Sequence, residues 1–257
     1  MKRAAEDLID TLFANNPQVG AVRISIIPYS SAVNIGAAYF TAATNQGAGA
    51  DTCVVERGTM PGAIVDDAPR PGRWAETSNS GANGQYHCPA SQVQPLLDIA
   101  KPAEQTTLRN LINSLNPDGW TAGHIGLAWG WYSVSPNWSA FWPANNQPKP
   151  QSPDVLKGVL LMTDGMFNTA YFGGNKNGDD PTVVHSSGDQ ALGLCQNIRD
   201  AGVALFTVAF DAPVSAADLL TTCAGGAGNA FTAATSSELR DKFRLVADRL
   251  SSLRIAK

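Results

Sequence analysis

Two largely apolar runs indicate that the chain contains buried strands. The first covers residues 159–162 and leads into Thr163, Asp164 and Gly165, and the second covers residues 203–210. Runs of this kind are typical of strands buried on both faces, as in a parallel sheet. Between them, residues 191–198 show helical spacing, and Gly202 fits a left-handed helix end. This order predicts a βαβ crossover in which the two runs are adjacent parallel strands.

The rest of the chain alternates between helical and extended patterns. Helical spacing of apolar residues recurs over residues 5–13, 108–115, 125–132 and 239–253. Residues 22–27 and 229–232 have the pattern of strands. Together these elements predict an α/β fold, a mostly parallel sheet with helices on both faces. We expect Leu160, Leu161, Leu205 and Val208 to lie buried in the middle of that sheet.

Three long stretches lack a periodic spacing of apolar residues. Residues from about 37 to 104 are rich in Gly, Ala, Asn, Pro and Ser, and we expect an irregular insertion there. Residues of about 137–154 and 166–187 have the composition of long loops, and the first of these carries tryptophans that we expect to anchor it. We interpret residues 1–257 as a single domain of this fold.

Charge and hydropathy exclude several classes of partner. The net charge is −4 and lysines and arginines do not cluster, which argues against nucleic acid and anionic membrane surfaces. No stretch approaches the ~20 apolar residues of a transmembrane helix. Met1, Lys2 and Arg3 lead into an amphipathic helix, so an export signal is absent from this chain.

The four cysteines favour disulfides, and hence an oxidising compartment. No C-x-x-C spacing is present, and His87 beside Cys88 lacks a second ligand pair for zinc. Of the three possible pairings we expect Cys53–Cys88 and Cys195–Cys223, because each of these stays within one local segment.

Asp164 is the leading candidate for chemistry, because open α/β sheets place ligands at the carboxyl ends of their strands. Simpler roles compete: Asp164 could close the following turn, Thr121 could be a helix N-cap, and His124 could be a partly exposed helix residue. The sequence has no G-x-S-x-G and no P-loop, which argues against an enzyme. The alternative is a metal-dependent hydrolase on a related α/β sheet that uses Asp164.

Several motifs resemble a known family. Residues 159–165 resemble the fourth strand and terminal Asp-Gly of von Willebrand factor A domains, whose sheet is Rossmann-type, and residues 119–121 resemble their threonine loop. Residues 27–34, 53–57, 121–129 and 161–169 resemble TadG-like proteins of the bacterial tight-adherence (Flp) pilus system. The resemblance runs from the first helix to the last.

The resemblance implies a metal-ion-dependent adhesion site. The family binds a divalent cation, Mg²⁺ or Ca²⁺, through an Asp-x-Ser-x-Ser motif, a threonine and an aspartate. Thr121 and Asp164 match the last two. Met1 falls inside what resembles the first helix, so the central first strand and its motif are lacking and the chain looks truncated at its N-terminus. We therefore expect metal binding to be weak or absent in this chain.

The missing strand has a structural consequence. The strands that contain Ile26 and Leu161 should stay apart by about 10 Å, two strand spacings. The family implies an extracytoplasmic, periplasmic module of cell adhesion and pilus assembly. It also implies a membrane anchor upstream, and pilus assembly components or pilin as protein partners.

Overall fold

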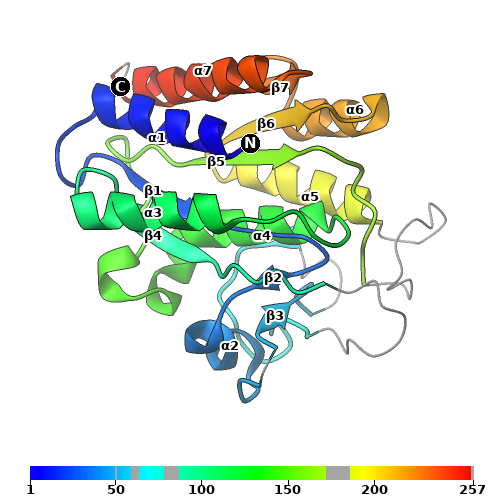
Figure 1. The fold of residues 1–257 in the computed structure, drawn as a ribbon. Helices are drawn as coiled ribbons and strands as arrows, with labels where there is room; N and C mark the ends of the chain where they lie inside the picture. Colours follow the sequence, from blue (N-terminus) through cyan, green and yellow to red (C-terminus); the bar gives the residue numbers. More distant parts are fainter. Residues whose placement is uncertain (50, 59–63, 78–86, 172–185, 256–257) are drawn as a thin grey trace.

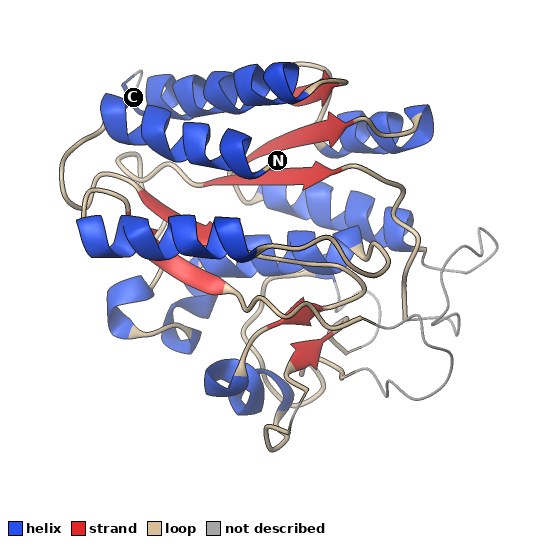
Figure 2. Ribbon diagram, viewed as in Figure 1, coloured by secondary structure: helices blue, strands red, loops and turns tan. Residues whose placement is uncertain are grey.

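The structure is a computed structural model, and it describes residues 1–257 except 50, 59–63, 78–86, 172–185 and 256–257 (Figure 1). It is a mixed α/β fold with small sheets between helices (Figure 2). The α-helices are α1 (Lys2–Asn15), α2 (Ala37–Thr44), α3 (Pro102–Ser114), α4 (Gly123–Val134), α5 (Ser187–Asp200), α6 (Val214–Cys223) and α7 (Ser236–Ile255). The strands are β1 (Arg23–Ile26), β2 (Val33–Asn34), β3 (Cys53–Val54), β4 (Gln94–Asp98), β5 (Gly158–Thr163), β6 (Ala204–Phe210) and β7 (Ala230–Ala233).

The two apolar runs form adjacent parallel strands, as predicted. β5 pairs with β6 in a register that places Leu161 opposite Thr207, and β6 pairs in parallel with β7. Leu161, Leu205 and Val208 are buried. Leu160 is only half-buried, so its predicted place in the middle of the sheet is wrong. The reason is topological, because β5 is the outer strand of this sheet, and no strand among the described residues pairs with its other edge.

The predicted mostly parallel sheet is only partly correct. β1 pairs with β4 in antiparallel orientation, and β2 pairs with β3 in the same way. No ladder joins β1 to β5 among the described residues, in keeping with the expected separation of these two strands. The parallel part of the fold is therefore the three-stranded sheet β5–β6–β7.

Helices cover the strands on both faces. α1 and α7 pack together over one face (Figure 1), and Ala4 of α1 shares a buried cluster with Phe206 of β6. α4 and α5 cover the other face, where Leu194 and Val159 belong to the same cluster. α5 begins where the hydroxyl of Ser186 accepts a hydrogen bond from the Asp189 amide.

The stretch of 37–104 is less irregular than expected. It contains α2, β3 and β4, and the start of α3. β4 was missed because a five-residue strand that contains Pro95 has neither alternation nor length. Its place beside β1 nevertheless buries Leu96 and Leu97.

Two disulfides connect local segments, and both pairings are as predicted. Cys53–Cys88 ties β3 to the segment before β4, with 5.7 Å between Cα atoms. Cys195–Cys223 ties α5 to the end of α6, with 5.0 Å between Cα atoms. Disulfides of this kind are typical of proteins outside the cytoplasm.

The tryptophan-rich loop of 137–154 is held against α4. It contains two 3₁₀ turns, Pro136–Phe141 and Ala144–Asn146. Trp138 stacks on Tyr132 at 4.1 Å between ring centroids, and the Trp142 indole donates to the Tyr132 carbonyl. Both indoles are buried, so they anchor the loop as expected. The predicted loop of 166–187 falls largely outside the described residues.

No helix in the described part of the chain is long and apolar enough to cross a membrane.

Candidate functional site

Thr121 and the segment after β5 meet at the carboxyl edge of the parallel sheet. The Asn168 amide donates to the Thr121 carbonyl at 3.0 Å. The Thr121 amide in turn donates to the Asn168 side-chain oxygen at 2.8 Å. This pair of hydrogen bonds fixes the loop before α4 against the segment that follows Asp164.

Two glycines of α4 make this approach possible. A Cβ on Gly123 would lie 2.1 Å from the Phe167 ring, and a Cβ on Gly126 would lie 2.5 Å from the Tyr29 ring. Both contacts are far inside van der Waals distance, so only glycine allows the two rings to pack on the helix. Packing against the two rings therefore explains the glycines in the motif of residues 121–129.

The simpler roles for Asp164 and Thr121 do not hold. The turn after β5 is closed by the Thr163 hydroxyl, which accepts from the Gly165 amide. The N-cap of α4 is Ala122, without a side-chain hydrogen bond. In the described part of the chain, neither the Asp164 carboxylate nor the Thr121 hydroxyl has a hydrogen-bond partner. Asp164 is exposed, and Thr121 is half-buried.

The oxygens of Thr121 and Asp164 are of the type that binds divalent cations, but they are too few to complete a coordination shell. Carboxylate and hydroxyl oxygens are ligands that Mg²⁺ and Ca²⁺ accept, but these ions take six or more oxygens. Thr121 and Asp164 offer two oxygens and one negative charge. Asp51 also lies close to the sulfurs of Cys53 and Cys88, within 4.8 Å, but those sulfurs form the disulfide and cannot act as thiolate ligands.

Tyr29 lies beside the Asp164 end of β5. Its hydroxyl donates to the Met162 carbonyl at 2.8 Å. Burial raises the pKa of Tyr29 above its usual value, a hydrogen bond with Thr163 opposes that change, and the Asp164 carboxylate adds to it. The phenol is therefore a neutral donor over the physiological pH range.

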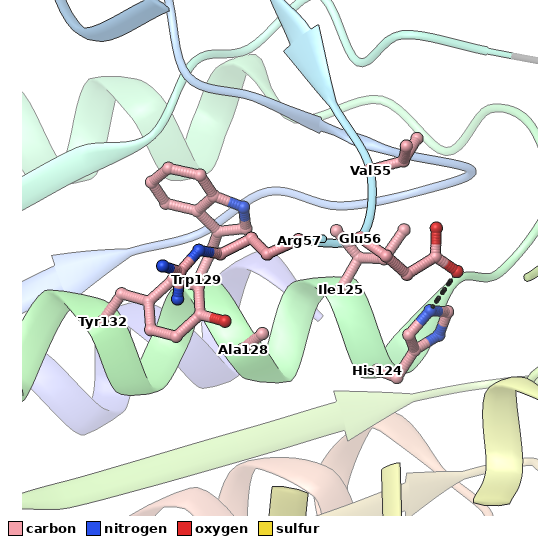
Figure 3. A pocket seen from close by; sticks show the side chains of 8 residues that line it. All are labelled: Val55, Glu56, Arg57, His124, Ile125, Ala128, Trp129 and Tyr132. Atoms are coloured by element: carbon pink, nitrogen blue, oxygen red, sulfur yellow. Dashed lines mark hydrogen bonds and ion pairs between the residues drawn. The ribbon is translucent and has the colours of Figure 1, made fainter. Parts of the chain in front are cut away.

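A second polar constellation is buried at the start of α4, and Figure 3 shows its Glu56 and His124 side chains. His124, the second residue of α4, places its Nε2 2.8 Å from Oε1 of Glu56. Its Nδ1 lies 2.7 Å from the Ser187 hydroxyl at the start of α5. Oε1 of Glu56 also accepts from the Tyr171 amide at 2.8 Å. His124 is 2% exposed, so the expectation of a partly exposed helix residue is wrong.

We refer to Glu56, His124 and Ser187 as the buried node. Its composition is that of a catalytic triad, but its geometry differs. In serine hydrolases the carboxylate binds Nδ1 and the nucleophile faces Nε2, whereas here the two nitrogens are exchanged. The Ser187 hydroxyl is also buried. The node therefore connects the segment after β3, α4 and α5, and presents no nucleophile.

A small cavity adjoins the node and leads to Arg57 (Figure 3). The space open to the centre of a water molecule is about 10 Å³, which is roughly what one bound water requires. Oε2 of Glu56 and the Tyr132 hydroxyl are buried without partners among the described residues. The buried guanidinium of Arg57 lies 5.1 Å from the Tyr132 ring centre and 4.9 Å from that of Trp138. Sequence reasoning named residues 53–57 and 121–129 as motifs but did not bring them together, because Glu56 and His124 are 68 residues apart.

The fold defines the chain as a mixed α/β protein with a small parallel sheet. No family model and no curated protein matches its sequence. A crystal structure of the pilus adhesin SpaC from Lactobacillus rhamnosus GG resembles it with a TM-score of 0.54 and 11% identity, over 97% of this chain and 28% of that chain. The chain thus spans less than a third of SpaC, and the likeness shows the fold alone.

Two further structures are less similar. SpaC in its open conformation gives a TM-score of 0.43 at 11% identity, over 62% of this chain and 22% of that chain. Proximal thread matrix protein 1 from the mussel byssus gives 0.37 at 20% identity, over 65% of this chain and 37% of that chain.

Proposed function

We propose that this chain is an extracytoplasmic adhesion or pilus-assembly module that binds protein partners at the carboxyl edge of its parallel sheet. The observation that carries the proposal is the meeting of the Thr121 loop with the segment after Asp164. The Thr121 hydroxyl and the Asp164 carboxylate have no hydrogen-bond partner within the described residues. The likeness of the fold to part of a pilus adhesin and the two disulfides support the same assignment.

The finer assignment is a von Willebrand factor A domain of the TadG-like type. Its support is the sequence resemblance around residues 119–129 and 159–169, joined in space by the Thr121–Asn168 pair. In this assignment the chain is not an enzyme, and its partners are pilus assembly components or pilin. A hydrolase that uses Asp164 needs a base or nucleophile beside that carboxylate. No hydrogen bond in the described part of the chain supplies one.

Thr121 and Asp164 would contribute to a Mg²⁺ or Ca²⁺ site that needs further ligands. With two oxygen donors, we expect Mg²⁺ to bind this chain with a dissociation constant above about 10⁻³ M, the weak end of the range of extracellular Ca²⁺ sites. A version that carries an added strand ending in Asp-x-Ser-x-Ser before Met1 should bind in the micromolar range. Titration calorimetry with Mg²⁺ and Mn²⁺ measures both.

The matched variants are Asp164→Asn and Asp154→Asn. Both remove one exposed carboxylate, but Asp154 precedes the opposite end of β5. In the version with the added strand, only Asp164→Asn should abolish binding, and a purified pilin should lose affinity for it in EDTA. Micromolar Mg²⁺ binding by the present chain, or equal effects of the two substitutions, would refute the proposed site.

A further inference from the structure

Three side chains of metal-ligand type meet at the disulfide between β3 and the segment before β4. A carboxylate oxygen of Asp51 and the sulfurs of Cys53 and Cys88 lie within 4.8 Å of one another, and no other group of this kind is present in the described part of the chain. Cys53 is buried, Cys88 is half-buried and Asp51 is exposed, so solvent reaches the group at the carboxylate. In the oxidised chain the two sulfurs are bonded to each other. Reduction of that bond would place two thiol ligands beside a carboxylate.

Hydrogen bonds hold the two cysteines close together independently of the disulfide. β2 and β3 lie side by side (Figure 1), and their register places Asn34 opposite Cys53. The Asn34 side chain donates to the carbonyl of Pro89, the residue after Cys88, at 2.8 Å. Its oxygen accepts from the Thr52 hydroxyl at 2.8 Å. Asn34 thus connects the backbones on both sides of the bridge, so we expect both cysteines to stay in place when the bridge opens.

The Asp51 carboxylate is held toward the first cysteine. Its Oδ1 accepts a hydrogen bond from the Cys53 amide at 2.8 Å. This is the turn that an aspartate commonly forms with the backbone two residues further on. A carboxylate has about four lone-pair sites, so it can accept this bond and bind a metal ion at the same time.

Two thiolates and a carboxylate suit zinc in type and in number. Zinc binds cysteine sulfur at about 2.3 Å and carboxylate oxygen at about 2.0–2.2 Å, and sites with three protein ligands keep water in the fourth position. Ligand atoms around a tetrahedral ion at these distances lie about 3.5–3.8 Å apart. The sulfurs therefore need to separate by about 2 Å from a bonded distance. Thiolate ligands also favour zinc over Mg²⁺ and Ca²⁺.

The second disulfide has different surroundings. Cys195 and Cys223 are both buried, and no third ligand of this kind joins their sulfurs among the described residues. The Arg199 guanidinium donates to the Cys223 carbonyl, which places a positive charge near that bridge. The second bridge therefore serves as a control within the same chain.

We propose that the chain binds zinc through Asp51, Cys53 and Cys88 when the Cys53–Cys88 bridge is reduced. A dithiol supplies two electrons and two protons, so that the protein disulfide becomes two thiols and the dithiol becomes a disulfide. Zinc then binds the two sulfurs as thiolates, and their two protons go to the solvent. The metal ion connects the same two segments that the bridge connects, so zinc and the disulfide exclude each other.

Limited reduction followed by cobalt titration tests the site. Dithiothreitol should open the Cys53–Cys88 bridge first, because Cys88 is half-buried and both cysteines of the other bridge are buried. After removal of the reductant under nitrogen, one equivalent of Co²⁺ should give the sulfur-to-cobalt charge-transfer band of two thiolate ligands, and Zn²⁺ should abolish it. The oxidised chain should give no such band. Excess Mg²⁺ should not compete, which separates this site from the one proposed at Thr121 and Asp164.

Asp51→Asn is the matched variant, because an asparagine oxygen can still accept from the Cys53 amide while the charge is lost. It should weaken Zn²⁺ binding by the reduced chain at least about tenfold, since even the loss of an outer-shell partner costs that much. Asp154→Asn removes an exposed carboxylate elsewhere and should leave the affinity unchanged. Zn²⁺ should also protect Cys53 and Cys88 from iodoacetamide in peptide mass mapping.

A reduced chain without the thiolate band would overturn the proposal, as would equal zinc affinity of the native chain and Asp51→Asn. Protection of Cys195 or Cys223 by zinc would place the metal at the other pair and would overturn it too. If reduction alone unfolds the chain, as tryptophan fluorescence would show, Zn²⁺ should restore the folded signal. Failure to restore it would count equally against the site.

Discussion

Removal of the Glu56 carboxylate should be among the most destabilising single changes in this chain. In Glu56→Ala, the Nε2 of His124 and the amide of Tyr171 both lose their acceptor inside the protein. Each buried group left unpaired costs about 1–3 kcal/mol, and breaking a buried pair from one side costs about 3–5 kcal/mol. We expect the free energy of unfolding to fall by about 3–5 kcal/mol.

Two further variants make the measurement specific. Glu56→Gln keeps an oxygen for the same donors and should cost about 1–2 kcal/mol, the loss of charge assistance. Glu76→Ala removes an exposed carboxylate from the segment that pairs with the Glu56 backbone, and should stay within about 0.5 kcal/mol of the native chain. Urea unfolding followed by tryptophan fluorescence gives all three values. A loss below about 1 kcal/mol for Glu56→Ala would refute the assigned role of the node.

Three other outcomes follow from the structure. Burial lowers the pKa of Lys157 to about 8 from 10.5, so unfolding takes up a proton between these values and stability should rise with pH from 8 toward 10.5. Lys157→Met should abolish that rise and stabilise the protein at pH 7 by about 1–3 kcal/mol, as thermal unfolding at several pH values would show. Replacing Cys195 and Cys223 with serine should cost about 3.5 kcal/mol in urea unfolding, given their separation of 28 residues. Gly123→Ala should lower the free energy of unfolding by about 1–3 kcal/mol and the melting temperature with it. Gly130→Ala should be neutral or stabilising, because its Cβ would lie 3.4 Å from the nearest atom, in Val159.

The parallel sheet could be predicted because its strands have strong local signals. β5 and β6 are largely apolar, and the helix and Gly202 between them allow one crossover. The disulfide pairing could also be predicted, because only one of the three possible pairings keeps both disulfides within local segments. In each case neighbouring residues determined the outcome.

The missed features depend on tertiary contacts. β4 has little intrinsic strand character and forms because β1 offers an edge. The half-burial of Leu160 depends on the lack of a described strand on one side of β5. An apolar run in the sequence does not indicate whether its strand lies in the middle or at the edge of a sheet. Glu56 and His124 are 68 residues apart, and no pattern in either segment indicates that they meet.

The buried node and the carboxyl edge of the sheet share one helix, which relates the two parts of the site. His124 follows Thr121 by three residues, and its ring is held by the segment after β3 and by α5. The first turn of α4 is therefore positioned from inside the protein, and the Asn168 pair positions the preceding loop from the β5 side. Groups fixed by their own packing need no further ordering when a ligand binds, which reduces the entropic cost of association. The loop that carries Thr121 thus has a preorganised frame in this chain, which the proposed cation site would use together with Asp164 and further ligands.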